Sequence, residues 1–223
     1  MGQHFDELRQ AMVDSQVRTT DVTNLRLLDA MLSVPREAFV SDQRKAFAYI
    51  DDDIEISGSG ATARRYVMEP SPFARLAQLA DVTPSDLVLD IGCGTGYSSA
   101  VLSKLGSAVI ALESDEELAA RATDILIENG FDNVAVVTGP FNQGYASEGP
   151  YDVIFVGGAA DEVPSALFDQ MKDGGRLVVV EGHGLSGFAT LYVKDGDVVS
   201  GRRAFNLSVK ELPGFQKEPE FSL

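Results

Sequence analysis

Residues 87–105 indicate a strand, a glycine-rich turn and a helix in immediate succession. The apolar run Leu87–Leu89 leads through Asp90 into a loop with three glycines, Gly92, Gly94 and Gly96. A helical pattern follows from Tyr97 to Leu105. Glycine permits a tight turn and lets a ligand lie against bare backbone. In open α/β sheets, ligands bind at such turns, outside the carboxyl ends of the strands.

The same alternation of apolar runs and helical segments continues through the second half of the chain. The further runs are 108–112, 134–137, 153–156 and 177–180. They are continuous rather than alternating, which is typical of strands covered on both faces. Alternation with helices predicts right-handed βαβ units, so we expect an α/β fold with a doubly wound, mostly parallel sheet.

The two ends of the chain differ from this core. Helical patterns at 5–18 and 24–32 predict N-terminal helices, the second capped by Thr23. Near the other end, 190–193 and 198–199 flank Lys194–Asp197 and predict an antiparallel hairpin, with a further strand at 204–209. We expect one domain over 1–210, with an N-terminal helical and acceptor-loop extension (1–80), a cofactor-binding core (81–210) and an irregular tail (211–223).

The charge balance bears on partners and location. The chain has 34 acidic against 18 basic residues, a formal net charge of −16. Nucleic-acid binders normally present a basic surface, so a nucleic-acid partner is not expected. Without a long apolar segment or a basic, apolar leader, neither a membrane partner nor secretion is expected. The single cysteine excludes an internal disulfide, and together these features favour a cytoplasmic protein.

The spacing of the glycine loop discriminates between cofactors. A dinucleotide loop has the pattern Gly-x-Gly-x-x-Gly, but here the third glycine comes one residue early and Tyr97 stands in its place. Asp90 before the loop suits a cationic ligand, such as a sulfonium with an amino-acid tail. Glu113 ends the next apolar run, 23 residues after Asp90, where a carboxylate can accept both ribose hydroxyls. We therefore expect S-adenosylmethionine as cofactor and a capping box from Ser114 to Glu117 in the helix that follows.

Segments throughout the chain resemble the protein-L-isoaspartate O-methyltransferase family. The similar segments are 12–18 (MVDSQVR), 30–40 (AMLSVPREAFV), 88–96, 151–160 (YDVIFVGGAA) and 174–178. The 30–40 segment is much rarer among proteins than the glycine loop, so it weighs most in the resemblance.

The resemblance implies a class I S-adenosylmethionine-dependent methyltransferase fold and a role in protein repair. The implied reaction moves a methyl group from S-adenosylmethionine to the carboxylate of isoaspartyl residues in damaged proteins. That carboxylate, with a pKa of about 4, is ionised at neutral pH and needs no general base. For the reaction, the protein needs only to align this carboxylate with the methyl group and to exclude water. Neither a metal site nor catalytic histidines are therefore expected. The implied cofactor contacts are Asp90, Gly92, Gly94, Gly96, Glu113 and Gly139.

Two segments depart from the family pattern. The family has Thr-Ile-Ser-Gln-Pro where this chain has Tyr66–Pro70, so the family's active-site serine falls on Met68. Ser71 is close by but sits at a different position of the turn. The family has Gly-Asp-Gly where this chain has Gly139-Pro140-Phe141, so an acid near the adenine is missing.

The segment 64–70, called the rewritten loop below, also contains Arg64 and Arg65. They either grip an anionic acceptor by bidentate hydrogen bonds or belong to a solvent-facing loop. Three functions stay open: an isoaspartyl methyltransferase, a methyltransferase of the same fold with another acceptor such as a small anionic molecule, and a non-catalytic binding protein that kept the fold.

Overall fold

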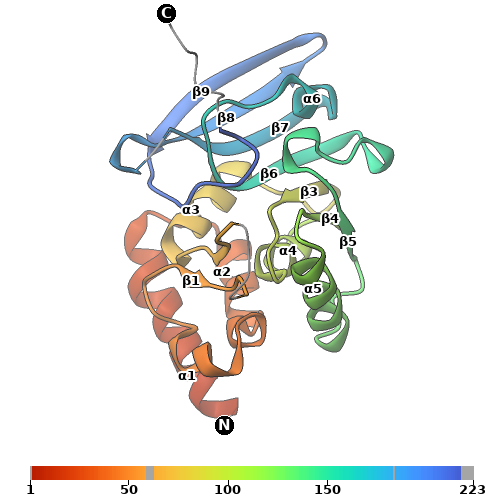
Figure 1. The fold of residues 1–223 in the computed structure, drawn as a ribbon. Coiled ribbons are helices and arrows are strands. Elements are labelled where there is room, and N and C mark those ends of the chain that lie inside the picture. Colours follow the sequence, from red (N-terminus) through yellow and green to blue (C-terminus); the bar gives the residue numbers. More distant parts are fainter. Residues whose placement is uncertain (1, 59–62, 183, 217–223) are drawn as a thin grey trace, which may run out of the picture.

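A seven-stranded sheet, in the order β5-β4-β3-β6-β7-β8-β9, runs through the computed structural model, which describes residues 2–58, 63–182 and 184–216 (Figure 1). Strands β3 to β7 pair with one another in parallel, whereas β8 is antiparallel to β7 and β9 is antiparallel to β8. The expected α/β fold with a mostly parallel sheet is therefore confirmed. The strand bounds are β3 Leu87–Ile91, β4 Ala108–Glu113, β5 Val134–Thr138, β6 Tyr151–Ala160, β7 Met171–Glu181, β8 Phe188–Asp195 and β9 Val198–Asn206.

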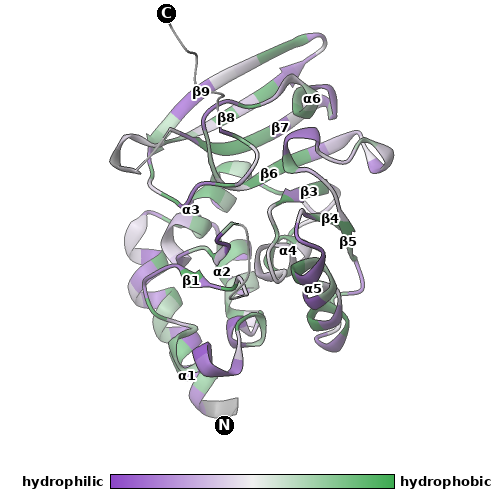
Figure 2. Ribbon diagram, in the orientation of Figure 1, coloured by the Kyte–Doolittle hydropathy of each residue, from purple (hydrophilic) through white to green (hydrophobic). Residues whose placement is uncertain are grey.

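Helices cover the two faces of the sheet unequally. One face packs against α3 Pro70–Ala80, α4 Tyr97–Ser103 and α5 Glu116–Glu128. Beyond them lie α2 Leu25–Ser33, which contacts α3 and α4, and α1 Gly2–Met12, and all five helices contribute to one apolar core. The other face is covered by α6, Ser165–Asp169, and by side chains of the irregular segments 141–145 and 212–215. Successive strand residues such as Val88 and Leu89 enter opposite cores, which explains the continuous apolar runs (Figure 2).

The helix starts differ from the expected caps by one residue. The side chain of Asn24, not Thr23, accepts the Leu27 amide and caps α2. Asp115, not Ser114, caps α5 by accepting two amides of its first turn. The Ser114 amide donates instead to the Glu113 carboxylate at 2.8 Å, which delays the start of the helix. Both predicted caps were therefore wrong.

The C-terminal part of the sheet is the expected hairpin. Strands β8 and β9 pair from Phe188–Asn206 to Asp195–Val198. The separate strand expected at 204–209 was wrong, because β9 simply continues to Asn206. Residues beyond it return to the sheet, where Leu212 donates its amide to the Ala159 carbonyl at 2.9 Å. Residues 217–223 of the expected tail lie outside the described residues.

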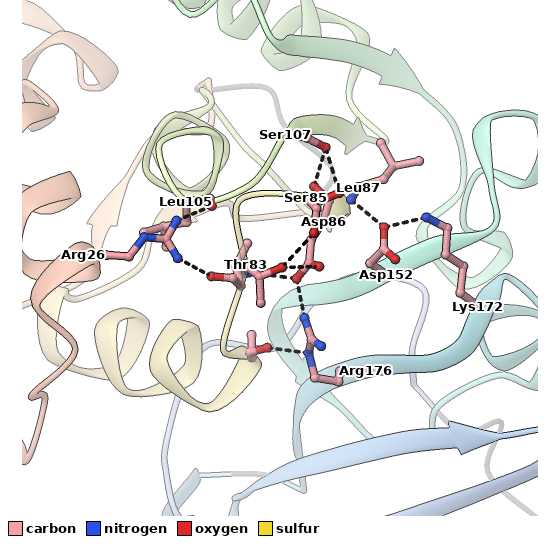
Figure 3. Close-up of polar contacts among 12 residues, drawn as sticks. Arg26, Thr83, Ser85, Asp86, Leu87, Leu105, Ser107, Asp152, Lys172 and Arg176 are labelled. Carbon is pink, nitrogen blue, oxygen red and sulfur yellow. Dashed lines mark hydrogen bonds and ion pairs between the residues drawn. The ribbon is translucent and has the colours of Figure 1, made fainter.

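Polar contacts fix the amino ends of the core strands, at the opposite edge from the glycine loop (Figure 3). Arg176 of β7 pairs with Asp86, which also accepts the Thr83 amide. Lys172 donates to Asp152 at 2.6 Å. Because these pairs lock the strand starts, the register at the carboxyl ends is well defined.

A small two-stranded sheet carries the rewritten loop. Strand β1, Ile54–Glu55, pairs antiparallel with β2, Tyr66–Val67, and the loop between them includes 59–62, outside the described residues. Strand β2 leads directly into α3, whose first residue is Pro70. Among the described residues, no helix has the length and apolarity that a membrane crossing requires.

Candidate functional site

The glycine loop follows β3, at the point where the strand order reverses. Strand β4 lies on one side of β3 and β6 on the other. All three loop glycines have positive φ: +84° at Gly92, +59° at Gly94 and +99° at Gly96. Side chains rarely tolerate this backbone region. The sequence therefore needs glycine at these positions to make the turn at all, and the turn places its amides at the carboxyl ends of the strands.

Glu113 is fully buried at the end of β4 and holds the loop in place. Its Oε1 accepts the amides of Ser114 and Asp115, at 2.8 and 3.2 Å. Its Oε2 accepts the Gly94 amide at 2.8 Å. The three amides stabilise the buried charge and occupy three of the roughly four acceptor positions of the carboxylate.

The remaining contact of Glu113 is with Arg65. Arg65 Nη2 lies 2.9 Å from Glu113 Oε2, and the arginine side chain is only 6% exposed. Its guanidinium carbon lies 4.8 Å from the centre of the Phe141 ring. The solvent-facing alternative is therefore wrong for Arg65. Arg64, in contrast, is 74% exposed and pairs with Glu55 at 3.7 Å.

Side chains of this chain also cover the bare glycine backbone. A methyl group placed on Gly92 would lie 2.6 Å from Leu212 Cδ1 and 3.3 Å from Arg65 Nη2. One placed on Gly94 would lie 2.6 Å from Ile56 Cδ1. The surface that the sequence predicts for a ligand is thus in contact with Leu212, Arg65 and Ile56.

Three hollows surround this cover. The inner hollow, with about 20 Å³ open to a water-sized sphere, is lined by Tyr66, Val67, Met68, Phe73, Gly92, Cys93, Tyr97, Ser98, Phe155 and Gly157. The outer hollow, also about 20 Å³ by this measure, is lined by Asp53, Arg64, Arg65, Tyr66, Met68, Gly157, Lys210, Glu211 and Leu212. The helix-side hollow, about 150 Å³, is lined by Ala63, Arg65, Ser114, Asp115 and Pro213. Arg65 separates the last two, and Tyr66 and Met68 separate the first two.

The acceptor candidates fall at different places in this arrangement. Met68 lines both the inner and the outer hollow. Its backbone carbonyl accepts a hydrogen bond from the buried Arg36 at 2.8 Å. Ser71 lines neither of these two hollows, and its hydroxyl donates to Thr20 at 3.1 Å. Gly139 donates its amide to the Glu113 carbonyl at 3.1 Å, beside the loop.

Asp90 is fully buried at the end of β3. The hydroxyls of Ser98 and Ser99 donate to its Oδ2, at 2.6 and 2.5 Å, and its Oδ1 has no partner among the described residues. Burial raises the pKa of Asp90 to about 6, although the two serine hydrogen bonds oppose the shift. Asp90 is therefore costly to ionise in the folded protein.

We expect Asp90→Asn to remove a pH dependence of stability. The folded pKa of about 6 lies above the ordinary aspartate pKa of about 4, so between these values the unfolded chain binds fewer protons and stability falls as pH rises. The contribution is fully present below pH 4 and is lost by pH 7, about 3 kcal/mol in all. Urea unfolding of both proteins from pH 4 to 7 measures it. Parallel stability curves for the two proteins would contradict the shift.

Sequence reasoning missed four residues of this site: Ile56, Phe141 as an arginine contact, Leu212 and Arg36. Their contacts join segments far apart in the chain, and no local pattern points to them. Within residues 2–58, 63–182 and 184–216, no group of three His, Cys, Asp or Glu side chains is placed to hold a metal ion.

A family model and two relatives from other organisms indicate the same protein family. Residues 7–206 match the family model for protein-L-isoaspartate(D-aspartate) O-methyltransferase. A protein-L-isoaspartate O-methyltransferase of Koribacter versatilis is 37% identical over 174 residues, 78% of this chain and 76% of the relative. One of Roseiflexus sp. is 34% identical over 210 residues, 94% of each chain.

Solved structures agree with the fold. A protein-L-isoaspartate O-methyltransferase superposes with a TM-score of 0.80 at 28% identity, covering 94% of this chain and 66% of that one. A Plasmodium falciparum structure in complex with S-adenosyl-L-homocysteine gives a TM-score of 0.75 over 93% of this chain, but at 20% identity it supports the fold alone.

Proposed function

The chain belongs to the protein-L-isoaspartate O-methyltransferase family, and we propose that it transfers a methyl group from S-adenosylmethionine to the carboxylate of isoaspartyl residues in proteins or peptides. The observation that supports this most is the glycine loop closed by a buried carboxylate, Glu113, at the switch point of the sheet. The proposed place of action is the cytoplasm.

The donor set suits the cofactor. Glu113 already accepts three backbone amides and Arg65, so it can accept a ribose hydroxyl at the oxygen that Arg65 gives up, and Gly92, Gly94 and Gly96 offer backbone to a ligand. Asp90, whose Oδ1 has no partner in the part of the chain that the structure describes, and Gly139 complete the proposed set. The sulfonium of the cofactor supplies an electrophilic methyl group. The side chains that cover the loop have to move before a ligand can contact it.

The acceptor has a simple requirement. An isoaspartyl carboxylate is already ionised at neutral pH, so the protein needs only to align it and keep water away. The inner hollow suits this task because apolar and aromatic side chains line much of it, and it borders both Gly92 and Met68. Tyr97, one of its walls, is buried.

The direct test is methyl transfer to an isoaspartyl peptide, followed by mass spectrometry. The matched control is the same peptide with a normal aspartyl bond. We expect a methyl ester on the isoaspartyl peptide alone. If neither peptide is methylated while the protein binds S-adenosylhomocysteine, the isoaspartyl activity is excluded and the fold serves another acceptor.

We expect Met68→Ser to raise kcat/KM for the isoaspartyl peptide about tenfold, since a hydrogen bond to a charged group contributes about 1.5–3 kcal/mol. The new hydroxyl can donate to the acceptor carboxylate, which the thioether of Met68 cannot do. Met68→Ala is the control, because it opens the same space without a hydroxyl. Equal gains in both variants would show that space, not the hydrogen bond, limits the reaction.

A second candidate is methyl transfer to another anionic acceptor. It is favoured by Met68 at the position of the family serine and by two exposed cations, Arg64 and Lys210, on the outer hollow. Screening small carboxylates with the same assay distinguishes it from the isoaspartyl activity.

A further inference from the structure

Arg65 makes the two kinds of contact that a bound nucleoside would make. Its guanidinium pairs with Glu113, the carboxylate proposed to accept a ribose hydroxyl, at 2.9 Å. It also lies over the Phe141 ring, at 4.8 Å. A ribose and a planar base would use these two surfaces, a carboxylate and an aromatic face, in the same way.

The two departures from the family sequence thus meet in space. Arg65 belongs to the rewritten loop before α3, and Phe141 follows Pro140 where the family has Gly-Asp-Gly. They are 76 positions apart, from 65 to 141, yet they form one buried contact. A change in one segment alone would leave the guanidinium without its second partner.

The backbone of Arg65 is fixed while its side chain has room to move. Its carbonyl accepts the Ile56 amide at 2.9 Å, and its amide donates to Ser57 Oγ at 3.2 Å. The side chain borders both the outer and the helix-side hollow. The helix-side hollow, about 150 Å³, has room for the guanidinium, so rotation about the side-chain torsions can carry it there without disturbing the β1–β2 pairing.

We propose that Arg65 is a latch on the cofactor site: it closes the site by pairing with Glu113 over Phe141, and S-adenosylmethionine binds only after this pair opens. The inference rests on the proposed function, because it takes Glu113 as the ribose ligand. Leu212 over Gly92 is the second part of the same cover.

The latch lowers apparent affinity by mass action. When only a fraction of molecules has the competent site, the observed Kd is the intrinsic Kd divided by that fraction. A closed form that holds more than nine molecules in ten weakens binding about tenfold or more. Removing the guanidinium should recover this loss.

The test is calorimetric binding of S-adenosylhomocysteine to the full chain. We expect Arg65→Met to lower Kd at least about tenfold. We expect Leu212→Ala to lower it by a smaller factor, since it uncovers Gly92 alone. Arg18→Met is the control, because it removes the same charge from an exposed arginine that pairs with Asp14 away from the site, and its Kd should stay within about twofold.

A second measurement separates the latch from a purely structural ion pair. Arg65→Met should lower the Tm of the ligand-free protein, because Glu113 loses a buried partner, yet increase the rise in Tm that S-adenosylhomocysteine produces. An unchanged or weaker affinity in Arg65→Met overturns the latch, as does failure of wild type and all variants to bind. Binding by the variant but not by wild type supports it.

If Arg65→Met does not fold, Arg65→Lys and Leu212→Ala decide the question. Lysine keeps the charge but lacks the planar group that stacks on Phe141, so we expect an intermediate Kd. None of these readouts uses an acceptor. The latch proposal can therefore be disproved while the isoaspartyl peptide is methylated, and it can be supported while that peptide is not methylated.

Discussion

Replacing Glu113 by glutamine is expected to weaken S-adenosylhomocysteine binding about tenfold or more, because the ribose loses its charged acceptor and one hydrogen bond to a charged group contributes about 1.5–3 kcal/mol. Glutamine has nearly the same shape, but its amide group cannot replace an oxygen that now accepts the Gly94 or Ser114 amide. The variant also leaves Arg65 as an unpaired buried cation.

The same substitution should destabilise the protein. Removing one partner of a buried ion pair costs about 3–5 kcal/mol, and Glu113 is fully buried. Urea unfolding followed by circular dichroism measures the loss, and calorimetry at a temperature where the variant is folded measures Kd.

A double variant separates the two roles of Glu113. In Glu113→Gln combined with Arg65→Met, no buried cation is left, so stability should recover in part. Binding should not recover, since the ribose acceptor is still missing. The coupling energy from this cycle gives the strength of the pair directly. Wild-type affinity in Glu113→Gln would show that the ligand does not use this carboxylate.

The main elements of the fold could be predicted because they depend on local patterns. The runs at 108–112 and 177–180 place apolar side chains on both faces of the sheet. They therefore predict strands covered on both faces, whatever their position in the sheet. The glycine loop needs positive φ, and only glycine adopts it freely. The family resemblance added the overall topology, which the family model and the relatives support.

Helix starts were less accurate because the sequence offered adjacent capping residues. Thr23 and Asn24 are both good N-caps, as are Ser114 and Asp115. For α5 the choice depends on Glu113, whose carboxylate takes the Ser114 and Asp115 amides. A side chain just before the helix thus takes part in its start, and the local capping pattern did not include it.

The closure of the site could not be predicted from local patterns. Arg65 and Glu113 are 48 residues apart, and nothing near Arg65 in the sequence indicates a buried partner. Leu212 follows the last strand in a segment expected to be irregular, yet it is 3% exposed and covers Gly92. The prediction that a ligand contacts these glycines was based on the loop sequence alone, without the side chains of Leu212, Arg65 and Ile56 that pack onto the loop.

Arg36 joins the family signature of the N-terminal segment to the acceptor side of the site. It is fully buried, and its guanidinium donates to the carbonyls of Ala48 and Met68, at 2.7 and 2.8 Å. Its guanidinium carbon lies 4.6 Å from the centre of the Tyr97 ring, at the start of α4. One side chain thus links the 48–49 turn, the segment before α3 and the helix that follows the glycine loop.

We expect Arg36→Ala to lower the free energy of unfolding by about 4 kcal/mol or more, because it leaves a cavity and two carbonyls without donors. Arg26→Ala is the matched control: Arg26 also donates to two backbone carbonyls, of Val82 and Leu105, but it lies at the other edge of the sheet and is exposed (Figure 3). Its loss should cost about 1 kcal/mol and leave methyl transfer unchanged.

Arg36 should also matter for the reaction itself, and this effect can be separated from stability. At a temperature where Arg36→Ala is still folded, the Met68 carbonyl is free to move, so the wall of the inner hollow is no longer fixed. We expect kcat to fall at least about tenfold, while the Kd for S-adenosylhomocysteine changes little, because the hydrogen bonds of Arg36 go to Ala48 and Met68, on the acceptor side. A fall in affinity with kcat preserved would instead place Arg36 among the residues that shape the cofactor side.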